Sequence, residues 1–395
     1  FIGQTEQIKR LKVVDYKKAE ETRFKAWAAD KAEYKDIFPT LEKAYQDYLP
    51  VSTLRTYMDQ GISGALVFGM AANFIFLEKA MGADGNAEAK QKTIDGLKKR
   101  SEAYMKLYNA PAERNITAAM LTMFYIEVPK DQHPAIFGEI LAKYPGTTPE
   151  EAFAKYTDEM MASTMMNSQE KMNAFFANPS LEQLQADPAY KVVKSVVDNY
   201  QANYEARVNA FNKTVEEQGS LYIKGLMEMD KTRTFYPDAN STMRLTYGSV
   251  RSYKPKDGVS YSYVTTLDGV EEKFVPGDDE FDAPARLMEL NKNNDFGIYG
   301  DKKTGELVTC FITDNDITGG NSGSPVVNGK GELIGLAFDG NWEAMSGDIV
   351  YDDRYKRTIN VDVRYVLFLI DKLAGATHIV KEMNLVQNGK KVTLK

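Results

Sequence analysis

The chain has 395 residues, of which 43% are hydrophobic and 27% are charged, and its formal net charge is −7. This length allows two or three domains, and the composition is ordinary for a globular protein. Because the sequence has no block of Lys and Arg that would follow a phosphate backbone, nucleic acid is excluded as an expected partner.

Residues 1–229 are predicted to form an α-helical domain. Apolar residues recur every three or four positions, as in residues 41–49 and 94–108, and this is the period of an amphipathic helix. A capping residue followed by proline marks helix starts at Thr148 and at Asp187. This part of the chain is therefore expected to be almost entirely helical.

The longest apolar run, residues 61–77, is predicted to be a buried helix. It contains Asn73 and three glycines, and it is shorter than the roughly 20 residues that cross a bilayer. No membrane span is therefore expected. Since the chain begins with Phe1 and not with Met, a processed or truncated N-terminus is also expected.

Residues 230–395 have the pattern of an antiparallel β domain. The segments MRLTYGSV, SYSYVTT, LVTCFIT, PVVNG and ELIGLAF are short and rich in β-branched or aromatic residues, and turn-forming residues separate them. One amphipathic helix is predicted near residues 361–375. The sequence thus predicts a helical domain followed by a β-barrel domain.

The segment ITGGNSGSPVVNG, residues 317–329, contains a candidate nucleophile, Ser322. A nucleophilic serine needs a constrained turn, an adjacent base and N–H groups directed at the developing oxyanion. Gly320 lacks a Cβ, so its N–H can face the site beside that of Ser322, and Gly323 permits a tight bend. With the hairpin predicted after it, the segment resembles the nucleophile loop of chymotrypsin-fold peptidases; the alternative is a plain glycine-rich turn.

Asn321 precedes the candidate nucleophile. Activated digestive proteases carry an aspartate at this place, and it pairs with a freshly cut N-terminus. Because an amide is a weaker partner for an ammonium than a carboxylate is, we infer an enzyme that does not depend on that activation switch.

Neither histidine of the chain is a good candidate for the base. A chymotrypsin-like triad has the order His, Asp, Ser, whereas His133 lies in the helical part and His378 follows the serine. The chain is therefore either a fragment of a longer peptidase, whose first barrel supplies His and Asp, or a pseudoenzyme. With these two histidines and the single Cys310, no metal site is expected.

A longer stretch extends the resemblance to one family. Residues 234–248, 315–348 and 357–372 together resemble the bacterial dipeptidyl-peptidase 7 and 11 family, serine peptidase family 46, and are closer to dipeptidyl-peptidase 7. The resemblance implies an α+β multidomain fold. An α-helical cap domain would span residues 1–229, and residues 230–395 would form the C-terminal barrel of a chymotrypsin-like double-barrel catalytic domain with a terminal helix.

The family resemblance also implies an activity. It implies a serine exopeptidase that releases dipeptides from free N-termini of peptides, without a cofactor, as a homodimer in the periplasm of a Gram-negative bacterium. The signal peptide and the catalytic His and Asp would lie upstream of this chain. Activity of these residues alone is then not expected, although the activity class of the intact protein is.

The resemblance assigns roles to individual residues. Ser322 matches the nucleophile, and Gly320 with Ser322 matches the oxyanion hole. Asp339 matches the acid that binds the free α-amino group, a charge-assisted contact that an internal peptide bond cannot make. Gly340 matches the position where arginine accompanies cleavage after Asp or Glu, so its lack of charge predicts a preference for hydrophobic residues.

Alternatives remain at this stage. Asp316, six residues before the nucleophile, lies where trypsin-like enzymes hold the acid that selects Arg or Lys. The motif TGGNSGSP also fits a glutamyl endopeptidase, and a non-catalytic peptide-binding protein could keep the cleft without a triad. A substrate with a blocked N-terminus and the sequence upstream of Phe1 would distinguish these possibilities.

Overall fold

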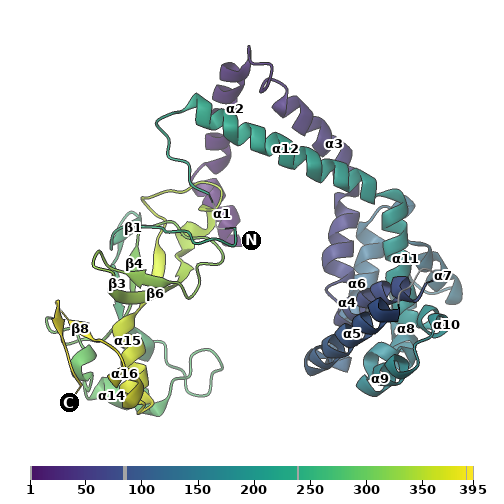
Figure 1. Ribbon diagram of the computed structural model, residues 1–395. Helices are drawn as coiled ribbons and strands as arrows, with labels where there is room; N and C mark the ends of the chain where they lie inside the picture. Colours follow the sequence, from purple (N-terminus) through teal and green to yellow (C-terminus); the bar gives the residue numbers. More distant parts are fainter. Residues whose placement is uncertain (1, 83–86, 238–239, 388, 395) are drawn as a thin grey trace. The chain divides into compact units, whose positions relative to one another are not determined.

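The computed structural model describes residues 2–82, 87–237, 240–387 and 389–394, and the chain packs as two units (Figure 1). One unit comprises residues 27–230, and the other comprises residues 1–26 together with 231–395. The helix α2 (Val13–Ala28) crosses the boundary between them.

The sequence prediction placed residues 1–26 in the helical domain, whereas their contacts group them with the sheet. The reason lies in α1 (Ile2–Arg10), which packs on the 3-10 segment η5 (Trp342–Ser346). A Cβ on Gly3 would collide with Trp342 and with Met345. Close packing against the sheet unit, rather than helical content, decides where this segment belongs.

The unit of residues 27–230 is helical and has one main core. Its helix α4 (Leu66–Met81) is buried, as predicted for the run 61–77, with Phe68, Phe74 and Leu77 fully buried. The helices of this unit are α3 (Ile37–Thr56), α4 (Leu66–Met81), α5 (Ala87–Leu107), α6 (Ala110–Glu127), α7 (Ala135–Lys143), α8 (Pro149–Ser163), α9 (Gln169–Ala177), α10 (Leu181–Ala186), α11 (Pro188–Asn203) and α12 (Glu205–Met229), with shorter turns η1 (Tyr57–Ile62), η2 (Lys130–Gln132) and η3 (Met165–Asn167).

The capping residues predicted from the sequence begin helices as expected. Thr148 and Glu151 form a capping box at the start of α8, with hydrogen bonds of 3.2 and 3.0 Å. Asp187 accepts from the N–H groups of Ala189 and Tyr190 at the start of α11, at 2.9 and 3.1 Å. These side chains satisfy N–H groups that have no partner within the helix.

Within the described ranges, no single helix is both long and apolar enough to cross a membrane. One pair of helical segments, Ile37–Ile62 and Leu66–Met81, passes the same criteria together but is bent by 101°.

The other unit contains a five-stranded antiparallel sheet in the order β3-β4-β7-β6-β5. Its strands are β3 (Val264–Thr266), β4 (Val308–Thr313), β5 (Pro325–Val327), β6 (Leu333–Gly340) and β7 (Thr358–Asp362). Small two-stranded sheets are formed by β1 (Tyr253–Lys256) with β2 (Val259–Tyr261), and by β8 (Val386–Gln387) with β9 (Lys390–Lys391). The predicted mixture of helix and β structure is confirmed, and the closed double barrel stays a prediction.

Short helices pack beside this sheet (Figure 1). They are α13 (Asp268–Glu271), α14 (Ala285–Lys292), η4 (Gly297–Tyr299), α15 (Val363–Phe368), η6 (Leu369–Leu373) and α16 (Thr377–Lys381). The fully buried Phe368 of α15 contacts Phe296 and Tyr299, with ring centroids 6.1 and 6.4 Å apart. The helix predicted near 361–375 therefore closes the core of this unit.

One predicted strand differs from the structure. Residues 243–250 were expected to form a strand, but only Val250 makes a β-bridge, to Thr313. The alternating side chains of Met243, Leu245 and Tyr247 are between 80% and 97% exposed. The residues with the alternating pattern thus form a segment that reaches β4 through this one bridge and lacks the regular hydrogen-bond ladder of a strand.

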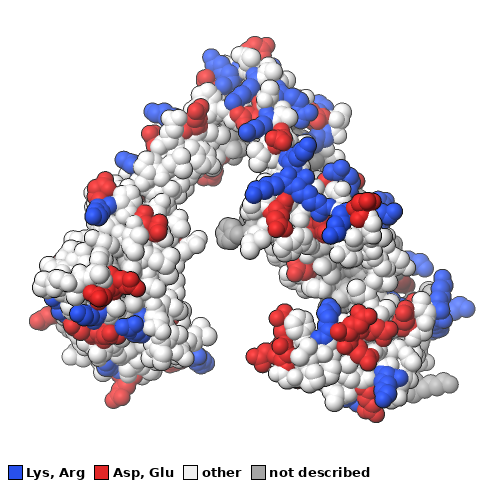
Figure 2. All heavy atoms as spheres, turned by 180° about the vertical axis from the view of Figure 1, so that it is seen from behind, with Lys and Arg blue, Asp and Glu red and all other residues white. Residues whose placement is uncertain are grey.

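Charged side chains of both signs are interspersed on the face of the molecule drawn in Figure 2. Such mixing keeps the surface hydrated and limits large fields of one sign.

Candidate functional site

The candidate nucleophile lies on an exposed loop between β4 and β5, residues 314–324, which we call the nucleophile loop. The loop has the left-handed backbone that favours glycine at Gly320 and Gly323, where φ is +102° and +81°. The N–H of Gly323 donates to the carbonyl of Ala337 at 2.7 Å, and Ser324 accepts from the N–H of Ala337 at 2.9 Å. These two backbone hydrogen bonds therefore attach the loop to strand β6.

Ser322 is exposed and its hydroxyl faces β6. Oγ of Ser322 donates to the carbonyl of Phe338 at 3.4 Å. Among the described residues, the N–H groups of Gly320 and Ser322 have no hydrogen-bond partner. The loop therefore carries an exposed hydroxyl and two N–H groups without partners among the described residues, and an oxyanion-stabilising serine site needs groups of both kinds.

Asp339 and Gly340 follow the carbonyl that Ser322 contacts. A β-bulge interrupts the pairing of β6 with β7 at Phe338, so that Ala337 lies opposite Asn360 and Asp339 lies opposite Ile359. The Asp339 side chain is exposed, and its Oδ1 accepts from the N–H of Gly340 at 2.7 Å. The structure thus brings Ser322 and Asp339 to the same end of β6.

Little space surrounds Gly340. A Cβ added there would lie 3.2 Å from Cβ of Ala344, tighter than an ordinary carbon contact. A side chain at this position therefore requires a small shift of the η5 segment.

A buried hydrogen-bond network supports the end of β6 behind Gly340. Nδ2 of Asn341 donates to Oε2 of Glu343 at 2.9 Å, and Oδ1 of Asn341 accepts from the N–H of Arg357 at 2.8 Å. The hydroxyl of Tyr253 also donates to Oε2 of Glu343, at 2.8 Å. Burial raises the pKa of Tyr253 to about 12, so this phenol stays a donor.

Asp316 is not free to select a basic substrate. Its Oδ1 lies 2.5 Å from Nζ of the buried Lys356, and its Oδ2 accepts from the hydroxyl of Tyr236 at 2.7 Å. Burial, and then this hydrogen bond to Asp316, raise the pKa of Tyr236 to about 12. The negative charge of Asp316 is therefore balanced within the protein, which argues against a preference for Arg or Lys.

Arg244 is a residue of this site that the sequence did not single out. Its Nη2 lies 3.2 Å from Oδ1 of Asn321 and 3.2 Å from Oγ1 of Thr318. Arg244 and Asn321 are 77 positions apart, so no local spacing could indicate the contact.

Neither histidine has a hydrogen bond to the Ser322 hydroxyl among the described residues. A ring nitrogen of His133 is 2.9 Å from the carbonyl of Val128, and the ring packs against Tyr125 at 4.8 Å. His378 lies in α16. In the described part of the chain, the one hydrogen-bond partner of the Ser322 hydroxyl is the Phe338 carbonyl.

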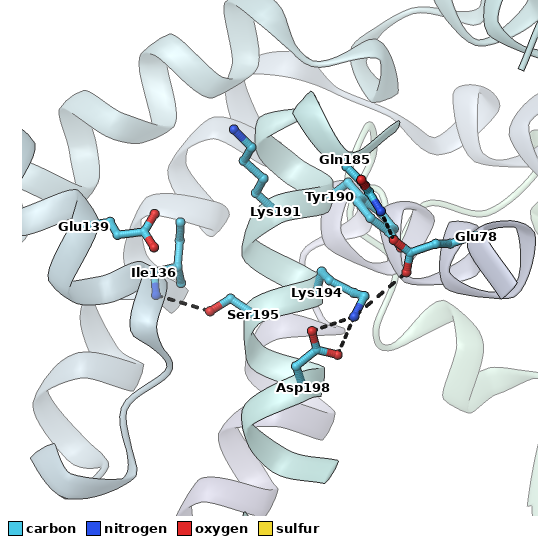
Figure 3. Close-up of a pocket in the computed structure, with 9 residues that line it drawn as sticks. All are labelled: Glu78, Ile136, Glu139, Gln185, Tyr190, Lys191, Lys194, Ser195 and Asp198. Carbon is cyan, nitrogen blue, oxygen red and sulfur yellow. Dashed lines mark hydrogen bonds and ion pairs between the residues drawn. The ribbon is translucent and has the colours of Figure 1, made fainter. Parts of the chain in front are cut away.

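A hollow in the helical unit is a second place where polar side chains gather (Figure 3). It has a volume of about 420 Å³ and lies among α4, α7, α10 and α11. Lys194 lies 2.5 Å from Asp198 and 3.9 Å from Glu78, and Gln185 donates to Glu78 at 2.8 Å. Since these side chains satisfy one another, the nucleophile loop remains the stronger candidate.

Over the ranges that the structure describes, no three His, Cys, Asp or Glu side chains gather in the manner of metal ligands.

Comparison with known proteins gives consistent matches along the whole chain. Residues 1–385 match the family described as Peptidase S46. Dipeptidyl-peptidase 7 of Phocaeicola vulgatus is 38% identical over 397 residues, which cover 98% of this chain and 53% of the relative. The Asp/Glu-specific dipeptidyl-peptidase of Flavobacterium psychrophilum is 32% identical over 398 residues, covering 99% of this chain and 54% of the relative.

Solved structures show the same similarity. The crystal structure of Porphyromonas endodontalis DPP11 in complex with the dipeptide Arg-Glu superimposes with a TM-score of 0.81 and 29% sequence identity. The match covers 96% of this chain and 54% of the crystallised chain. This chain therefore spans about half the length of the relatives that it matches.

Proposed function

This chain belongs to the peptidase S46 family, and from that membership we propose that the whole protein is a serine-type dipeptidyl-peptidase with Ser322 as its nucleophile. One observation carries the proposal: the Ser322 hydroxyl is exposed, and the N–H groups of Ser322 and of Gly320, two residues before it, are unpaired among the described residues. The relatives named as dipeptidyl-peptidases, and the relative solved with a bound dipeptide, support the reaction class.

The proposed chemistry is acyl transfer. A base that the described residues do not supply would take the proton of Oγ as Oγ of Ser322 attacks the scissile carbonyl carbon. The N–H groups of Gly320 and Ser322 would donate to the carbonyl oxygen as it becomes an oxyanion. The base would then protonate the leaving amine, and water would hydrolyse the acyl-enzyme to release the dipeptide.

Asp339 is proposed to hold the substrate's free α-amino group. It follows the residue whose carbonyl contacts Ser322, and its side chain is exposed. A carboxylate binds an ammonium by a charge-assisted hydrogen bond, and the N-terminus of a peptide is the only part of its backbone with that charge. A fixed anion near the nucleophile would therefore limit the released piece to a short N-terminal fragment.

A preference for hydrophobic residues at the cleavage position is the finer part of the proposal. Gly340 provides no charge for an acidic side chain, and the charge of Asp316 is balanced by Lys356. With no unpaired charge at Gly340 or at Asp316, an apolar side chain is favoured over a charged one, because a charged side chain would lose its hydration without gaining a partner there. The proposed periplasmic location and homodimer rest on the family resemblance alone.

The test is substitution of the nucleophile in the whole protein. Ser322→Ala is expected to abolish dipeptide release and labelling by a fluorophosphonate, with the unfolding temperature unchanged. Ser324→Ala is the matched control, because Ser324 lies on the same loop and its hydrogen bonds with described residues are made by its backbone. Dipeptide release by Ser322→Ala at the wild-type rate would refute the proposal.

A second measurement separates the proposed exopeptidase from a glutamyl endopeptidase. A peptide with a free N-terminus is compared with the same peptide carrying an acetyl group. Cleavage of the free peptide alone is expected, because acetylation removes the charge that Asp339 would bind. Equal cleavage of both peptides would favour the endopeptidase, and cleavage of neither would favour a non-catalytic peptide-binding protein.

A further inference from the structure

A cation from a distant part of the sequence holds the turn that precedes the nucleophile. In this turn, residues 318–321, the N–H of Asn321 donates to the carbonyl of Thr318 at 3.2 Å, and Oδ1 of Asn321 accepts from the N–H of Thr318 at 3.1 Å. Nη2 of Arg244 lies 3.2 Å from Oγ1 of Thr318 and 3.2 Å from Oδ1 of Asn321. The guanidinium therefore bridges the two ends of the turn.

The turn has little stiffness of its own, because its central residues are Gly319 and Gly320. φ of Gly320 is +102°, and no described atom beyond its chain neighbours lies within 4 Å of the position that a Cβ would take. Glycine loses more conformational freedom on being fixed than any other residue does. Contacts from outside the two glycines must therefore hold the N–H of Gly320 in place.

The direction of the Ser322 N–H depends on the same turn. This N–H belongs to the rigid peptide plane that joins Asn321 to Ser322, so it rotates with ψ of Asn321. The carbonyl of Asn321 accepts from the N–H of Ser324 at 2.9 Å, and its side chain is held by Thr318 and Arg244. Loosening Asn321 would thus move both N–H groups that are proposed to bind the oxyanion.

We infer that Arg244 is a positioning residue for the proposed reaction. By clamping the turn at Thr318 and Asn321, it keeps the N–H groups of Gly320 and Ser322 directed at the substrate oxygen. This inference rests on the proposed function, since an oxyanion hole has a role only if Ser322 is acylated. Because this cation is a side chain and not a newly cut N-terminus, the clamp needs no activating cleavage. A guanidinium also stays charged in proteins, whereas an α-amino group loses its charge at a pH of about 8.

The segment that carries Arg244 is itself tied to the nucleophile loop. Oγ1 of Thr246 donates to the carbonyl of Asp316 at 2.7 Å, and the N–H of Ser249 donates to Oδ1 of Asp314 at 2.6 Å. A Cβ on Gly248 would lie 2.6 Å from the backbone nitrogen of Asn315. Because the segment and the loop pack this closely, the backbone that carries Arg244 is fixed, and it holds the guanidinium against the turn.

The test uses the whole protein with Arg244→Ala and a peptide substrate with a free N-terminus. Loss of one oxyanion donor lowers kcat of a serine peptidase by about 10²–10³. A loosened hole is expected to lower kcat about 10- to 100-fold, with KM little changed because the ground-state contacts remain. A loss of general stability would instead reduce the amount of folded enzyme without this separation of kcat from KM.

Three comparisons make the test specific to the clamp. Arg251→Ala is the matched control, because Arg251 lies on the same segment but pairs with Asp314, at 3.1 Å; its kcat is expected to stay near that of the wild type. Arg244→Lys is expected to recover part of the lost kcat, since the cation is kept while the planar fork is lost. Guanidinium ion added to Arg244→Ala is expected to raise kcat.

Each outcome decides the inference. An unchanged kcat in Arg244→Ala overturns it, as does an equal loss in Arg251→Ala. If Arg244→Ala does not fold, Arg244→Lys decides: a lowered kcat with an unchanged unfolding temperature supports the clamp, and a wild-type kcat overturns it. Dipeptide release retained by Ser322→Ala would refute the proposed function itself, whereas its loss together with full activity in Arg244→Ala would refute only the positioning role.

Discussion

Nζ of Lys356 lies 2.5 Å from Oδ1 of Asp316, and the lysine side chain is only 4% exposed. The pair joins the nucleophile loop to the chain between η5 and β7. A charge buried to this extent is stable only beside its partner. The pair therefore fixes Asp316, near the start of the nucleophile loop. It also neutralises the negative charge that a trypsin-like enzyme would use to select its substrate.

Breaking this pair from the lysine side is expected to destabilise the sheet unit. Among the described side chains, Lys356→Met leaves the carboxylate of Asp316 with the Tyr236 hydroxyl as its partner, and loss of one member of a buried pair costs about 3 kcal/mol or more. Denaturant unfolding of the variant measures the loss. The double variant Lys356→Met with Asp316→Asn should regain much of the stability, and a double variant no more stable than Lys356→Met would contradict the pair's role.

Asp339→Asn is expected to weaken the use of substrates with a free N-terminus. A hydrogen bond to a charged group contributes about 1.5–3 kcal/mol, so kcat/KM should fall about 10- to 100-fold. The comparison is made on one peptide at a pH where its α-amino group is protonated. Asp348→Asn, at another acidic position of the sheet unit, serves as the control and should leave kcat/KM unchanged; an equal effect of both changes would count against the proposed role.

Gly340→Arg is expected to shift the proposed preference for apolar residues at the cleavage position towards acidic ones. A guanidinium pairs with a carboxylate in a two-pronged hydrogen bond, so kcat/KM for a peptide with Glu there should rise about 10-fold or more relative to Leu. Gly340→Ala tests the effect of added volume without added charge, because it places only a Cβ at this position, 3.2 Å from Cβ of Ala344. A shift of equal size in Gly340→Ala would mean that space, not charge, sets the preference.

The buried carboxyl of Glu113 is expected to make stability decrease as pH rises. Burial raises its pKa above the usual value of 4.5, although its Oε2 accepts from the N–H of Val67 at 3.1 Å. With the pKa raised in the folded state, the native protein binds more protons than the unfolded chain, so the free energy of unfolding falls as pH passes from 4.5 to the raised pKa.

Glu113→Gln should remove that decrease, because the amide does not titrate. Denaturant unfolding at several pH values above 4.5 gives the slope for each variant. Glu127→Gln is the matched control, since Glu127 is exposed on the same helix, α6, and should keep the wild-type slope. A wild-type slope in Glu113→Gln would assign the pH dependence to other groups.

Local features of this chain were predictable where a short stretch of sequence determines them. The caps at Thr148 and Asp187 depend on residues two or three positions away, and the hairpin after Pro325 depends on its own turn. The pairing of β4 with β7, rather than with its sequence neighbour β5, depends on contacts across about 50 residues. No periodicity of a single segment contains that information.

The site shows the same division. Ser322, Gly320 and Asp339 could be proposed from a motif because they lie within one continuous stretch. Arg244 could not, since its contact with Asn321 exists only once the segment 243–250 lies against the nucleophile loop. That segment was predicted as a strand from its alternating residues, but alternation cannot tell whether a partner strand is available.

The bulge at Phe338 determines which way the following residue points. In an uninterrupted ladder, Asp339 would lie opposite the buried Thr358 and on the same face as the buried Ala337. The extra residue moves Asp339 one step along, opposite Ile359, and onto the exposed face. One extra residue thus decides which face of the strand carries Asp339. Without it, the carboxylate proposed to recognise the end of a peptide would point into the protein interior.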